Sequence, residues 1–252
     1  MNEQHRHLKL LSLLHEHKAL ATQQIVEWLH ISPATARRDI SKLNAQGKLR
    51  KVRNGVEALT ANGFDVLPGE APATHINHYD EKKRIADAAA ASCHSGNSVV
   101  LTCGSTMLLL GQALCGRDLQ VITNYLPLVN SLIAGNHQDI VILGGQYNKN
   151  KGITLSLEDQ DFAYAADILF TSGKGFSEDG LYKNDMLLAY SEQKILSKAQ
   201  KLVVLLDHHK LGKKAGMLFS PLADIDLLIT GREADAALIA RLRDKGLNII
   251  LV

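Results

Sequence analysis

The sequence predicts an α/β protein of two domains: a small N-terminal domain of helices with one β-hairpin, and a larger domain built on a mainly parallel sheet. Three observations carry this prediction. A capped, basic helix pattern begins at Ser32, and an Asn-Gly pair separates two short apolar-containing runs after it. From Tyr79 onward, short Val/Ile/Leu runs alternate with helical patterns, which is typical of domains with a buried parallel sheet.

The helix pattern that begins at Ser32 has a basic outer face. The Ser32 hydroxyl can cap the first-turn amides, and the proline that follows suits the first helical position. At 3.6 residues per turn, Ala36, Ile40 and Leu43 share an apolar face. The opposite face is small, polar and basic, with Ala34, Arg38, Ser41 and Lys42 on it and Arg37 beside them. Such a face can enter a DNA groove, where guanidinium groups reach phosphates or guanine.

Two further helices and a hairpin complete the predicted DNA-binding unit. A leucine stripe over residues 10–14 predicts a first helix, and Thr22 is expected to cap a short second helix with Trp28 in the core. Only a tight turn fits between this helix and Ser32, as a helix-turn-helix requires. The Asn-Gly pair predicts a hairpin, and hence a basic wing. The predicted DNA-contacting residues are Thr22, Ser32, Ala34, Thr35, Arg37, Arg38, Ser41, Lys42, Lys51 and Arg53.

The positive charge of the chain is concentrated in its N-terminal quarter. Residues 1–60 contain ten Lys/Arg and five Asp/Glu, whereas the rest of the chain contains eighteen and twenty-one. A local basic field attracts a polyanion even though the whole chain has a formal net charge of only +2. A solvated charged face on a small helical domain is the plainer alternative. The cap, turn, spacing and wing together favour binding to double-stranded DNA.

Length and composition set the expected domain organisation. A chain of 252 residues that is 46% hydrophobic can bury one large core and the core of a small accessory domain. The expected domains are residues 1–60 and 77–252, joined by a Pro- and Gly-containing linker at residues 61–76. The sequence shows no membrane-spanning stretch and no signal-peptide pattern, so a cytoplasmic protein is expected. Its three cysteines, Cys93, Cys103 and Cys115, form no paired framework and are expected to be reduced.

The second domain alternates strand and helix patterns. Strands are predicted at residues 99–102, 119–123, 140–143, 168–171, 202–206, 227–230 and 249–252. Helices are predicted at residues 81–93, 106–114, 127–133, 185–199 and 233–244. Continuous apolar strands between helices indicate a mainly parallel sheet covered on both faces. Ligands of such sheets bind beyond the carboxyl ends of the strands.

Polar, glycine-bearing loops follow the predicted strands. Gly104, Ser105 and Thr106 precede a helix, so free amides, two hydroxyls and a glycine can cradle a phosphate, although an ordinary helix cap is the alternative. The loops after the next four strands supply hydroxyl, amide, ammonium and carboxylate groups, at residues 123–125, 144–147, 172–175 and 207–210. Simple turn chemistry explains any one loop. Together they suit a phosphorylated polyol better than an apolar ligand.

Both domains resemble the DeoR family of transcriptional regulators. In the N-terminal part the matching residues are Arg6, Leu10, Leu14, Ser32, Thr35, Ala36, Arg37, Arg38, Asp39 and Ile40. The C-terminal part is similar to the family's sugar-phosphate sensor domain, whose fold is related to that of ribose-5-phosphate isomerase. The resemblance covers almost the whole chain and implies a transcriptional repressor.

A narrower resemblance, to ascorbate-utilisation regulators within that family, rests on longer stretches. These are residues 80–82, 103–106, 122–128, 144–149, 171–175, 180–183 and 215–220. The resemblance implies that L-ascorbate 6-phosphate is the effector and that its binding releases the repressor from the operator. The loops and the resemblance together give the expected effector-binding residues, which are Lys82, Cys103, Gly104, Ser105, Thr106, Thr123, Asn124, Tyr125, Gly144, Gly145, Gln146, Lys174, Asp207 and Lys210.

Two loops depart from the family's pattern. The family commonly has an acidic residue before Gly-Thr-Thr where this chain has Cys103, and many members have Ser-Ser where this chain has His208 and His209. Without a carboxylate the first loop is more favourable to an anion. The histidines are expected to be exposed or to neighbour the ligand, because a metal site would need a third ligand that the sequence does not place.

Three classes of function fit some of these features. A ligand-responsive repressor would account for all of these features. A sugar-phosphate isomerase is the alternative, with Asp207, Lys174 and Glu192 as acid/base groups, but an isomerase gains nothing from a basic winged helix. A constitutive DNA-binding or architectural protein would not need so many polar strand ends. We expect no enzymatic activity, no cofactor and no metal. We also expect a homodimer or homotetramer, because binding to paired half-sites supplies affinity and specificity.

Overall fold

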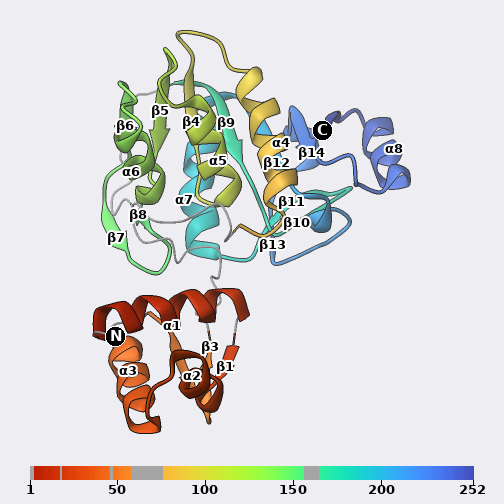
Figure 1. The fold of residues 1–252 in the computed structure, drawn as a ribbon. Helices are drawn as coiled ribbons and strands as arrows, with labels where there is room; N and C mark the ends of the chain where they lie inside the picture. The colour runs from red at the N-terminus through yellow and green to blue at the C-terminus, as the bar shows by residue number, and fades with distance from the viewer. Residues whose placement is uncertain (1–2, 18, 46–47, 58–75, 156–164) are drawn as a thin grey trace. The chain divides into compact units, whose positions relative to one another are not determined.

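The computed structural model describes residues 3–17, 19–45, 48–57, 76–155 and 165–252. The chain forms two compact units, Met1–Asp65 and Val66–Val252 (Figure 1). Each unit has an apolar core of its own. The expected linker at residues 61–76 lies, except for Ile76, outside the described residues. Within the described ranges, no helix combines the length and the apolar character needed to cross a membrane.

The N-terminal unit consists of three helices and a small antiparallel sheet. The helices are α1 (Glu3–His17), α2 (Thr22–Leu29) and α3 (Pro33–Ala45). The strands are β1 (Ala19–Ala21), β2 (Arg50–Val52) and β3 (Gly55–Glu57), in the order β1-β3-β2. The apolar faces predicted from helical periodicity form the core, which comprises Leu10, Leu14, Leu20, Ile25, Leu29, Ala36, Ile40, Leu43, Leu49 and Val56. The predicted winged helix-turn-helix architecture is confirmed.

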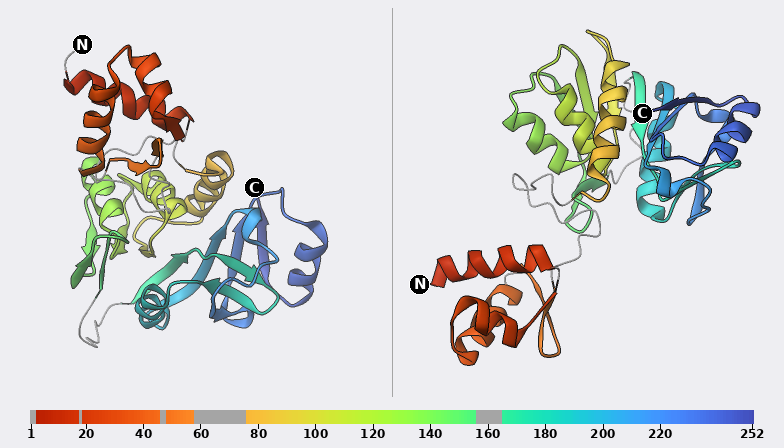
Figure 2. Two further views of the ribbon diagram at one scale, coloured as in Figure 1. Left: turned by 90° about the horizontal axis from the view of Figure 1, so that it is seen from below. Right: turned by 45° about the vertical axis from the view of Figure 1, so that its right-hand side comes forward.

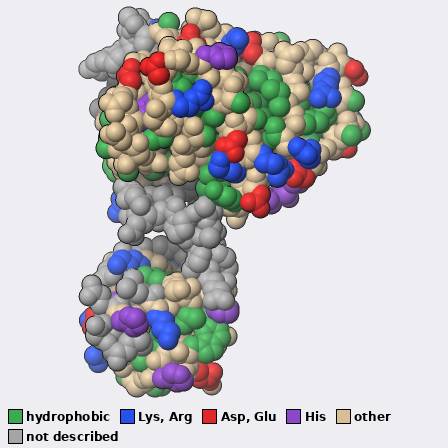
Figure 3. Space-filling model, turned by 45° about the horizontal axis from the view of Figure 1, so that its top comes forward, with side chains coloured by type: hydrophobic (Ala, Val, Ile, Leu, Met, Phe, Trp, Pro, Cys, Tyr) green, Lys and Arg blue, Asp and Glu red, His purple; other side chains and the backbone are tan. Residues whose placement is uncertain are grey.

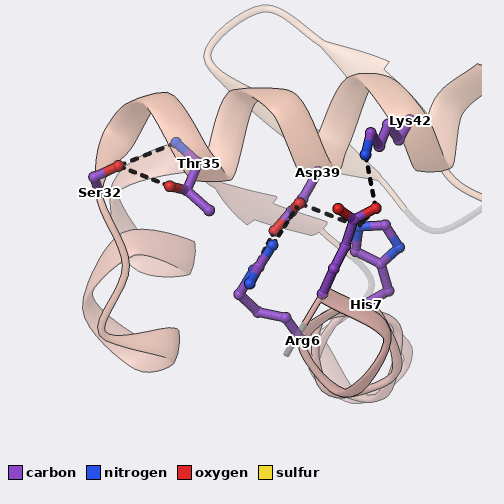
Figure 4. Close-up of polar contacts among 7 residues, drawn as sticks. Arg6, His7, Ser32, Thr35, Asp39 and Lys42 are labelled. Atoms are coloured by element: carbon purple, nitrogen blue, oxygen red, sulfur yellow. Dashed lines mark hydrogen bonds and ion pairs between the residues drawn. The ribbon is translucent and has the colours of Figure 1, made fainter. Parts of the chain in front are cut away.

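The N-termini of α2 and α3 are capped in different ways. Ser32 caps α3 as predicted, because its Oγ accepts a hydrogen bond from the Thr35 amide at 3.2 Å and lies 2.9 Å from the Thr35 hydroxyl (Figure 4). The prediction that Thr22 caps α2 is wrong. Ala21 occupies the cap position, and its amide donates to the Gln24 side chain at 2.8 Å. Thr22 is instead the first helical residue.

The hairpin turn begins one residue earlier than the sequence pattern predicts. The register of β2 and β3 leaves Arg53 and Asn54 as the turn, with Asn54 in the left-handed conformation at φ 63°. Gly55 is the first residue of β3, where a Cβ would lie 2.4 Å from the Leu20 carbonyl oxygen. Glycine is therefore needed for close strand approach rather than for the turn itself. The Thr22 amide donates to the Asn54 carbonyl at 2.9 Å and ties the start of α2 to this wing.

A seven-stranded parallel sheet lies at the centre of the C-terminal unit (Figure 1). Its strands are β4 (Ser98–Leu101), β5 (Gln120–Thr123), β6 (Ile140–Ile142), β9 (Ala166–Thr171), β12 (Ala199–Leu206), β14 (Leu227–Thr230) and β15 (Asn248–Leu251). The strand order is β15-β14-β12-β9-β4-β5-β6. The order of the chain reverses between β4 and β9, and the carboxyl ends at such a reversal are where α/β sheets bind ligands.

Helices cover both faces of this sheet. On one face α4 (Tyr79–Ala91), α5 (Ser105–Leu114) and α6 (Leu126–Ala134) lie side by side (Figures 1 and 2). On the other, α7 (Met186–Leu196) and α8 (Ala236–Asp244) share an apolar cluster with Val100, Leu169 and Val204 from the strands. The predicted strands and helices are all present, and their bounds shift by a few residues. The mainly parallel α/β fold is confirmed.

Smaller elements join the predicted ones. A three-stranded antiparallel sheet contains β10 (Gly175–Ser177), β11 (Gly180–Lys183) and β13 (Met217–Pro221). A two-stranded hairpin contains β7 (Gln146–Asn148) and β8 (Ile153–Leu155). Two short 3₁₀ helices follow strands, η2 (His208–Lys210) after β12 and η3 (Leu222–Asp224) after β13. These runs are too short to give a periodic signal, which is why the sequence predicted neither strands nor helices there.

Candidate functional site

The outer face of α3 presents a row of polar and basic side chains. Thr35 is half-buried and bonded to Ser32, while Ala36 and Ile40 are buried below it. The exposed residues of this helix include the predicted DNA-contacting residues Ala34, Arg37, Arg38, Ser41 and Lys42. The apolar and polar faces predicted for α3 therefore agree with the burial of its residues in the structure.

Four of the predicted DNA-contacting residues carry a charge that no acidic side chain in the described ranges pairs with. Arg37 and Arg38 lie on α3, Lys51 lies on β2, and Arg53 lies in the wing turn, and all four are exposed. Lys42 differs, because its ammonium group lies 2.7 Å from Glu3 (Figure 4). Unpaired surface cations can exchange their counterions for DNA phosphates.

A cleft of about 750 Å³ lies between α2, the start of α3 and the wing. Thr22, Arg37 and Lys51 are among its lining residues, so one predicted DNA-contacting residue from each of the three elements borders the same concave surface. The Lys51 amide donates to the Asn44 side chain at 2.8 Å, which fixes the wing against α3. The wing and α3 are thus held at a fixed distance from each other.

Asp39 attaches α3 to α1 from the buried side of the helix (Figure 4). Arg6 donates to its carboxylate from Nε at 2.6 Å and from Nη2 at 3.1 Å, and the His7 ring nitrogen lies 3.1 Å from the same group. Burial would raise the pKa of Asp39, but the hydrogen bonds from Arg6 and His7 outweigh burial and hold the pKa below its ordinary value. A charged carboxylate therefore sits under the recognition helix.

In the C-terminal unit, the loop after β4 forms an uncapped helix start. Gly104 precedes α5 with φ 131°, a backbone conformation that favours glycine, and provides no side-chain cap. Ser105 is half-buried and Thr106 is buried in the first turn, whose amides have no partner within the helix. Burial raises the pKa of Cys103 to about 12, so its thiol is neutral. A helix N-terminus beside a neutral thiol favours an anion.

Two lysines and an aspartate converge beside the neighbouring strands. The Asp207 Oδ2, after β12, lies 3.3 Å from the Lys210 ammonium nitrogen and 3.8 Å from that of Lys82 on α4. Lys82 and Asp207 are buried, and Lys210 is half-buried. The Lys210 ammonium group also lies 3.5 Å from the Ser172 hydroxyl, after β9. The sequence predicted Lys82, Asp207 and Lys210 as site residues, and the structure brings these three together.

The charges of this cluster are unbalanced. Burial lowers the pKa of Lys82, and the positive charge of Lys210 lowers it further, while Asp207 opposes both. Burial is also the main cause that lowers the pKa of Lys210, with Lys174 adding to it. Burial would raise the pKa of Asp207, but Lys210 and Lys82 lower it overall. The charges of Lys82, Lys174 and Lys210 thus act on one another, with the Asp207 and Glu81 carboxylates opposing them. A dianionic ligand would relieve the mutual repulsion of the lysines.

Lys174 is exposed, between β9 and β10, and its charge acts on both Lys82 and Lys210. Acidic and basic side chains are interspersed over the face of this unit drawn in Figure 3.

The loop after β5 uses its polar groups within the fold. The Thr123 hydroxyl donates to the Leu101 carbonyl at 2.7 Å and accepts from the Tyr125 amide at 3.1 Å. The Asn124 side chain donates to the Thr154 carbonyl at 3.0 Å. Within the described residues, the buried Tyr125 hydroxyl has no hydrogen-bond partner, and burial raises its pKa. These bonds hold Thr123 and Asn124 in place, and their part in effector binding stays a prediction.

The glycine loop after β6 lies apart from the lysine cluster. Gly144, Gly145 and Gln146 are exposed, and Gln146 begins β7. β6 is the edge strand, and β5, β4 and β9 lie between it and β12. The prediction grouped these residues with Asp207 because both loops follow strands of the same sheet. The sequence does not show the order of the strands, and so it does not show how far apart the two loops lie.

Sequence reasoning did not select Ser172 or the buried pair of Lys183 and Glu192 as binding residues. Lys183 donates to Glu192 and, at 2.8 Å, to the Thr171 hydroxyl, which itself donates to Glu192 at 3.1 Å. Glu192, considered above as an acid/base group, is therefore engaged in a network beneath the end of β9. No local sequence signal pairs a lysine of one antiparallel strand with a glutamate of the helix that follows.

Two family models match the chain. The DeoR-like helix-turn-helix domain matches residues 6–62, and the DeoR C-terminal sensor domain matches residues 77–232. Among solved structures, ribose 5-phosphate isomerase A from Methanocaldococcus jannaschii is 20% identical, with a TM-score of 0.42 over 54% of this chain and 55% of that chain.

Curated relatives match over the whole length. The HTH-type transcriptional regulator UlaR from Escherichia coli strain K12 / DH10B is 49% identical over 253 residues, covering 100% of both chains. UlaR from Shigella sonnei strain Ss046 matches to the same extent. These relatives are transcriptional regulators, which excludes the isomerase alternative. The chain thus belongs to the DeoR family and is a transcriptional regulator with a DNA-binding domain and a small-molecule sensor domain.

Proposed function

We propose that this protein represses an ascorbate utilisation operon and that L-ascorbate 6-phosphate releases it from its operator. In this proposal residues 1–60 bind DNA, residues 77–252 bind the effector, and the protein acts in the cytoplasm as a homodimer or homotetramer. The observation that carries the effector half is the shared Asp207 carboxylate oxygen, 3.3 Å from Lys210 and 3.8 Å from Lys82.

The chemistry of a phosphorylated polyol supports this assignment. A phosphate dianion can accept from the first-turn amides of α5 and from the ammonium groups of Lys82, Lys174 and Lys210. The Asp207 carboxylate, an acceptor, suits a sugar hydroxyl rather than the phosphate. A cluster of lysines with the Asp207 carboxylate thus offers complementary groups to both ends of such a molecule. The resemblance of the strand-end loops to ascorbate-utilisation regulators supports ascorbate utilisation as the regulated pathway.

The DNA half rests on four cations of the N-terminal unit that pair with no acidic side chain in the described ranges. Arg37 and Arg38 lie at the recognition helix, and Lys51 and Arg53 lie on the wing. A helix in the major groove with a basic wing against the backbone uses both sets at once. Repression follows from occupancy of the operator, and release follows if the effector prefers a state of the protein with low operator affinity.

The decisive experiment measures effector binding and operator release on the same protein. Calorimetric titration with L-ascorbate 6-phosphate is compared with L-ascorbate, inorganic phosphate and ribose 5-phosphate, and a gel-shift titration follows operator release by each. We expect the first ligand to bind most tightly and to release the operator. Lys210→Ala should abolish this response, whereas Lys213→Ala, an exposed lysine outside the cluster, should not. Equal binding of all four ligands would contradict the assigned effector.

A further inference from the structure

Histidine and glutamate side chains from separate elements meet beside the N-terminus of α4. His78 precedes α4, Glu81 lies in its first turn, and His209 lies in η2 after β12. One potential ligand atom from each of the three lies within 4.8 Å of the other two. The sequence had placed only a histidine pair, and the fold supplies the further ligands that it could not place.

The two imidazoles of this group are not used elsewhere in the fold. The rings of His78 and His209 stack with centroids 3.9 Å apart, and both residues are exposed. Neither ring makes a hydrogen bond with any residue that the structure describes. Their nitrogen lone pairs are therefore accessible, and the exposed rings can turn about their side-chain torsions toward a shared ion.

Glu81, in contrast, is held firmly in position. It is buried, with 6% exposure, and its Oε1 accepts from the His208 amide at 2.7 Å. Its Oε2 lies 3.0 Å from the His208 ring nitrogen. Carboxylates that bind metals are typically oriented by hydrogen bonds of this kind. His208 thus positions Glu81 while His78 and His209 remain available.

A second grouping, of Glu81, His208 and Glu233, has the same spacing but is already engaged. Glu233 lies 2.5 Å from Arg84 in an ion pair, and the His208 ring contacts Glu81. A metal ion there would have to displace both partners. In the first grouping, Glu81 can bind an ion through a further lone pair while it keeps its contacts with His208, and the two exposed rings need only rotate, so the geometry favours it.

We propose that His78, Glu81 and His209 form a binding site for a divalent transition-metal ion of the zinc class. Two imidazoles and one carboxylate are ligands that Zn²⁺ and its neighbours prefer, whereas Mg²⁺ and Ca²⁺ favour oxygen ligands alone. Three protein ligands leave a fourth position open to water or to a bound molecule. The site borders the lysine cluster, since Glu81 precedes Lys82 and His209 precedes Lys210 in the chain. It does not depend on the identity of the effector.

The test uses the full chain, freed of metal with a chelator and titrated with Co²⁺, whose visible absorption reports tetrahedral coordination. We expect one saturable Co²⁺ site per chain that Zn²⁺ displaces and Mg²⁺ does not. The double variant His78→Gln/His209→Gln should lose this site. His208→Ala should weaken it by about 10- to 100-fold, because Glu81 loses its positioning bonds. His94→Gln, an exposed histidine outside the cluster, is the matched control and should bind as the parent does.

Two results would overturn the proposal: no saturable site in the parent chain, or undiminished binding in the double variant, which would place the metal at other histidines. Circular dichroism and thermal unfolding accompany each titration. If the double variant does not fold, His209→Gln alone decides the matter, since it changes only an exposed ring. Loss of Co²⁺ absorption in that folded variant supports the site, and unchanged absorption refutes it.

Discussion

Arg6 on α1 holds Asp39 on α3, the residue that follows Arg38 in the chain, with two hydrogen bonds. Asp39 is 1% exposed, so the recognition helix is anchored from its buried side by an ion pair as well as by apolar packing. Because neighbouring helical residues point about 100° apart, this anchor also fixes the direction in which Arg38 projects. The first helix therefore supports the orientation of α3, the helix proposed to contact DNA.

We expect Arg6→Leu to destabilise the N-terminal unit by about 3 kcal/mol, because it leaves a buried carboxylate without its main partner. Trp28, the only tryptophan, lies in this unit, so its fluorescence during urea unfolding reports the unit within the full chain. Lys42→Leu, which removes an exposed pair with Glu3, is the control and should cost less than about 1 kcal/mol. Equal costs for the two variants would contradict this role of Asp39.

The ion pair between Arg6 and Asp39 predicts how the stability of the N-terminal unit depends on pH. The pKa of Asp39 is lower in the folded protein than its ordinary value, so the pair stabilises the fold above that value and loses this effect as the pH falls toward the folded pKa. We expect the stability difference between the parent chain and Arg6→Leu to be constant near neutrality and to shrink below about pH 4. Fluorescence-detected urea unfolding at a series of pH values measures it. A difference that grows on acidification would contradict the assignment.

For the DNA interface, we expect Arg38→Ala to weaken operator binding by about 1–3 kcal/mol and to relax base preference, if the side chain reads a base edge. Lys51→Ala should weaken binding to operator and scrambled DNA alike and reduce the salt dependence. Arg50→Ala is the matched wing control, because Arg50 is already paired with Glu57. Gel-shift titrations at several salt concentrations separate the three variants. Unchanged affinity in the first two would refute the proposed interface.

For the effector site, we expect Ser105→Asp to abolish effector binding and to produce a repressor that no longer responds. The new carboxylate would stand at the N-terminus of α5 and repel the phosphate that the helix amides should hold. Calorimetry measures the loss, and operator affinity without effector should stay at the level of the parent chain. Undiminished binding of L-ascorbate 6-phosphate would move the phosphate site away from this loop.

Release from DNA requires that the effector prefer a state in which paired winged helices cannot reach both half-sites. The segment at residues 61–76 contains Gly63, Pro68, Gly69 and Pro72, so a change in subunit packing is a more economical route than strain passed along that segment. We expect light scattering to show a change of mass on addition of L-ascorbate 6-phosphate, or X-ray scattering to show a change of shape at constant mass. A tightly bound effector that alters neither property nor operator affinity would refute this coupling.

Most of the fold could be predicted because its signals are local. Ser32 and Pro33 marked the start of α3, and the strand and helix patterns after residue 79 gave the parallel sheet within a few residues. Trp28 was predicted to be buried but is 36% exposed, and its ring lies tilted at 45° beside that of His17, with centroids 4.7 Å apart. Trp28 lies at the border of the apolar face of α2, and helical periodicity alone does not show where a narrow apolar face ends.

The candidate site was predictable only in part, because its geometry depends on strand order and on long-range pairs. The loops containing Gly104 and Asp207 could be selected from their position after strands. Nothing in the sequence indicates that Gly144 follows an edge strand, or that Glu81 would face His209 across two elements. Hydrogen bonds that occupy Thr123 and Asn124 are likewise invisible before the fold is known.

The division of the chain has a consequence for its synthesis. The DNA-binding unit occupies the first quarter of the chain, whereas Asp207 and Lys210 follow the fifth strand of the parallel sheet and reach their place only after β12 has joined β9. As the ribosome releases the chain, the helix-turn-helix unit can therefore fold before the residues of the proposed effector cluster have met. Binding to paired half-sites and the response to an effector would both wait for the second unit, so errors in folding that unit would affect both.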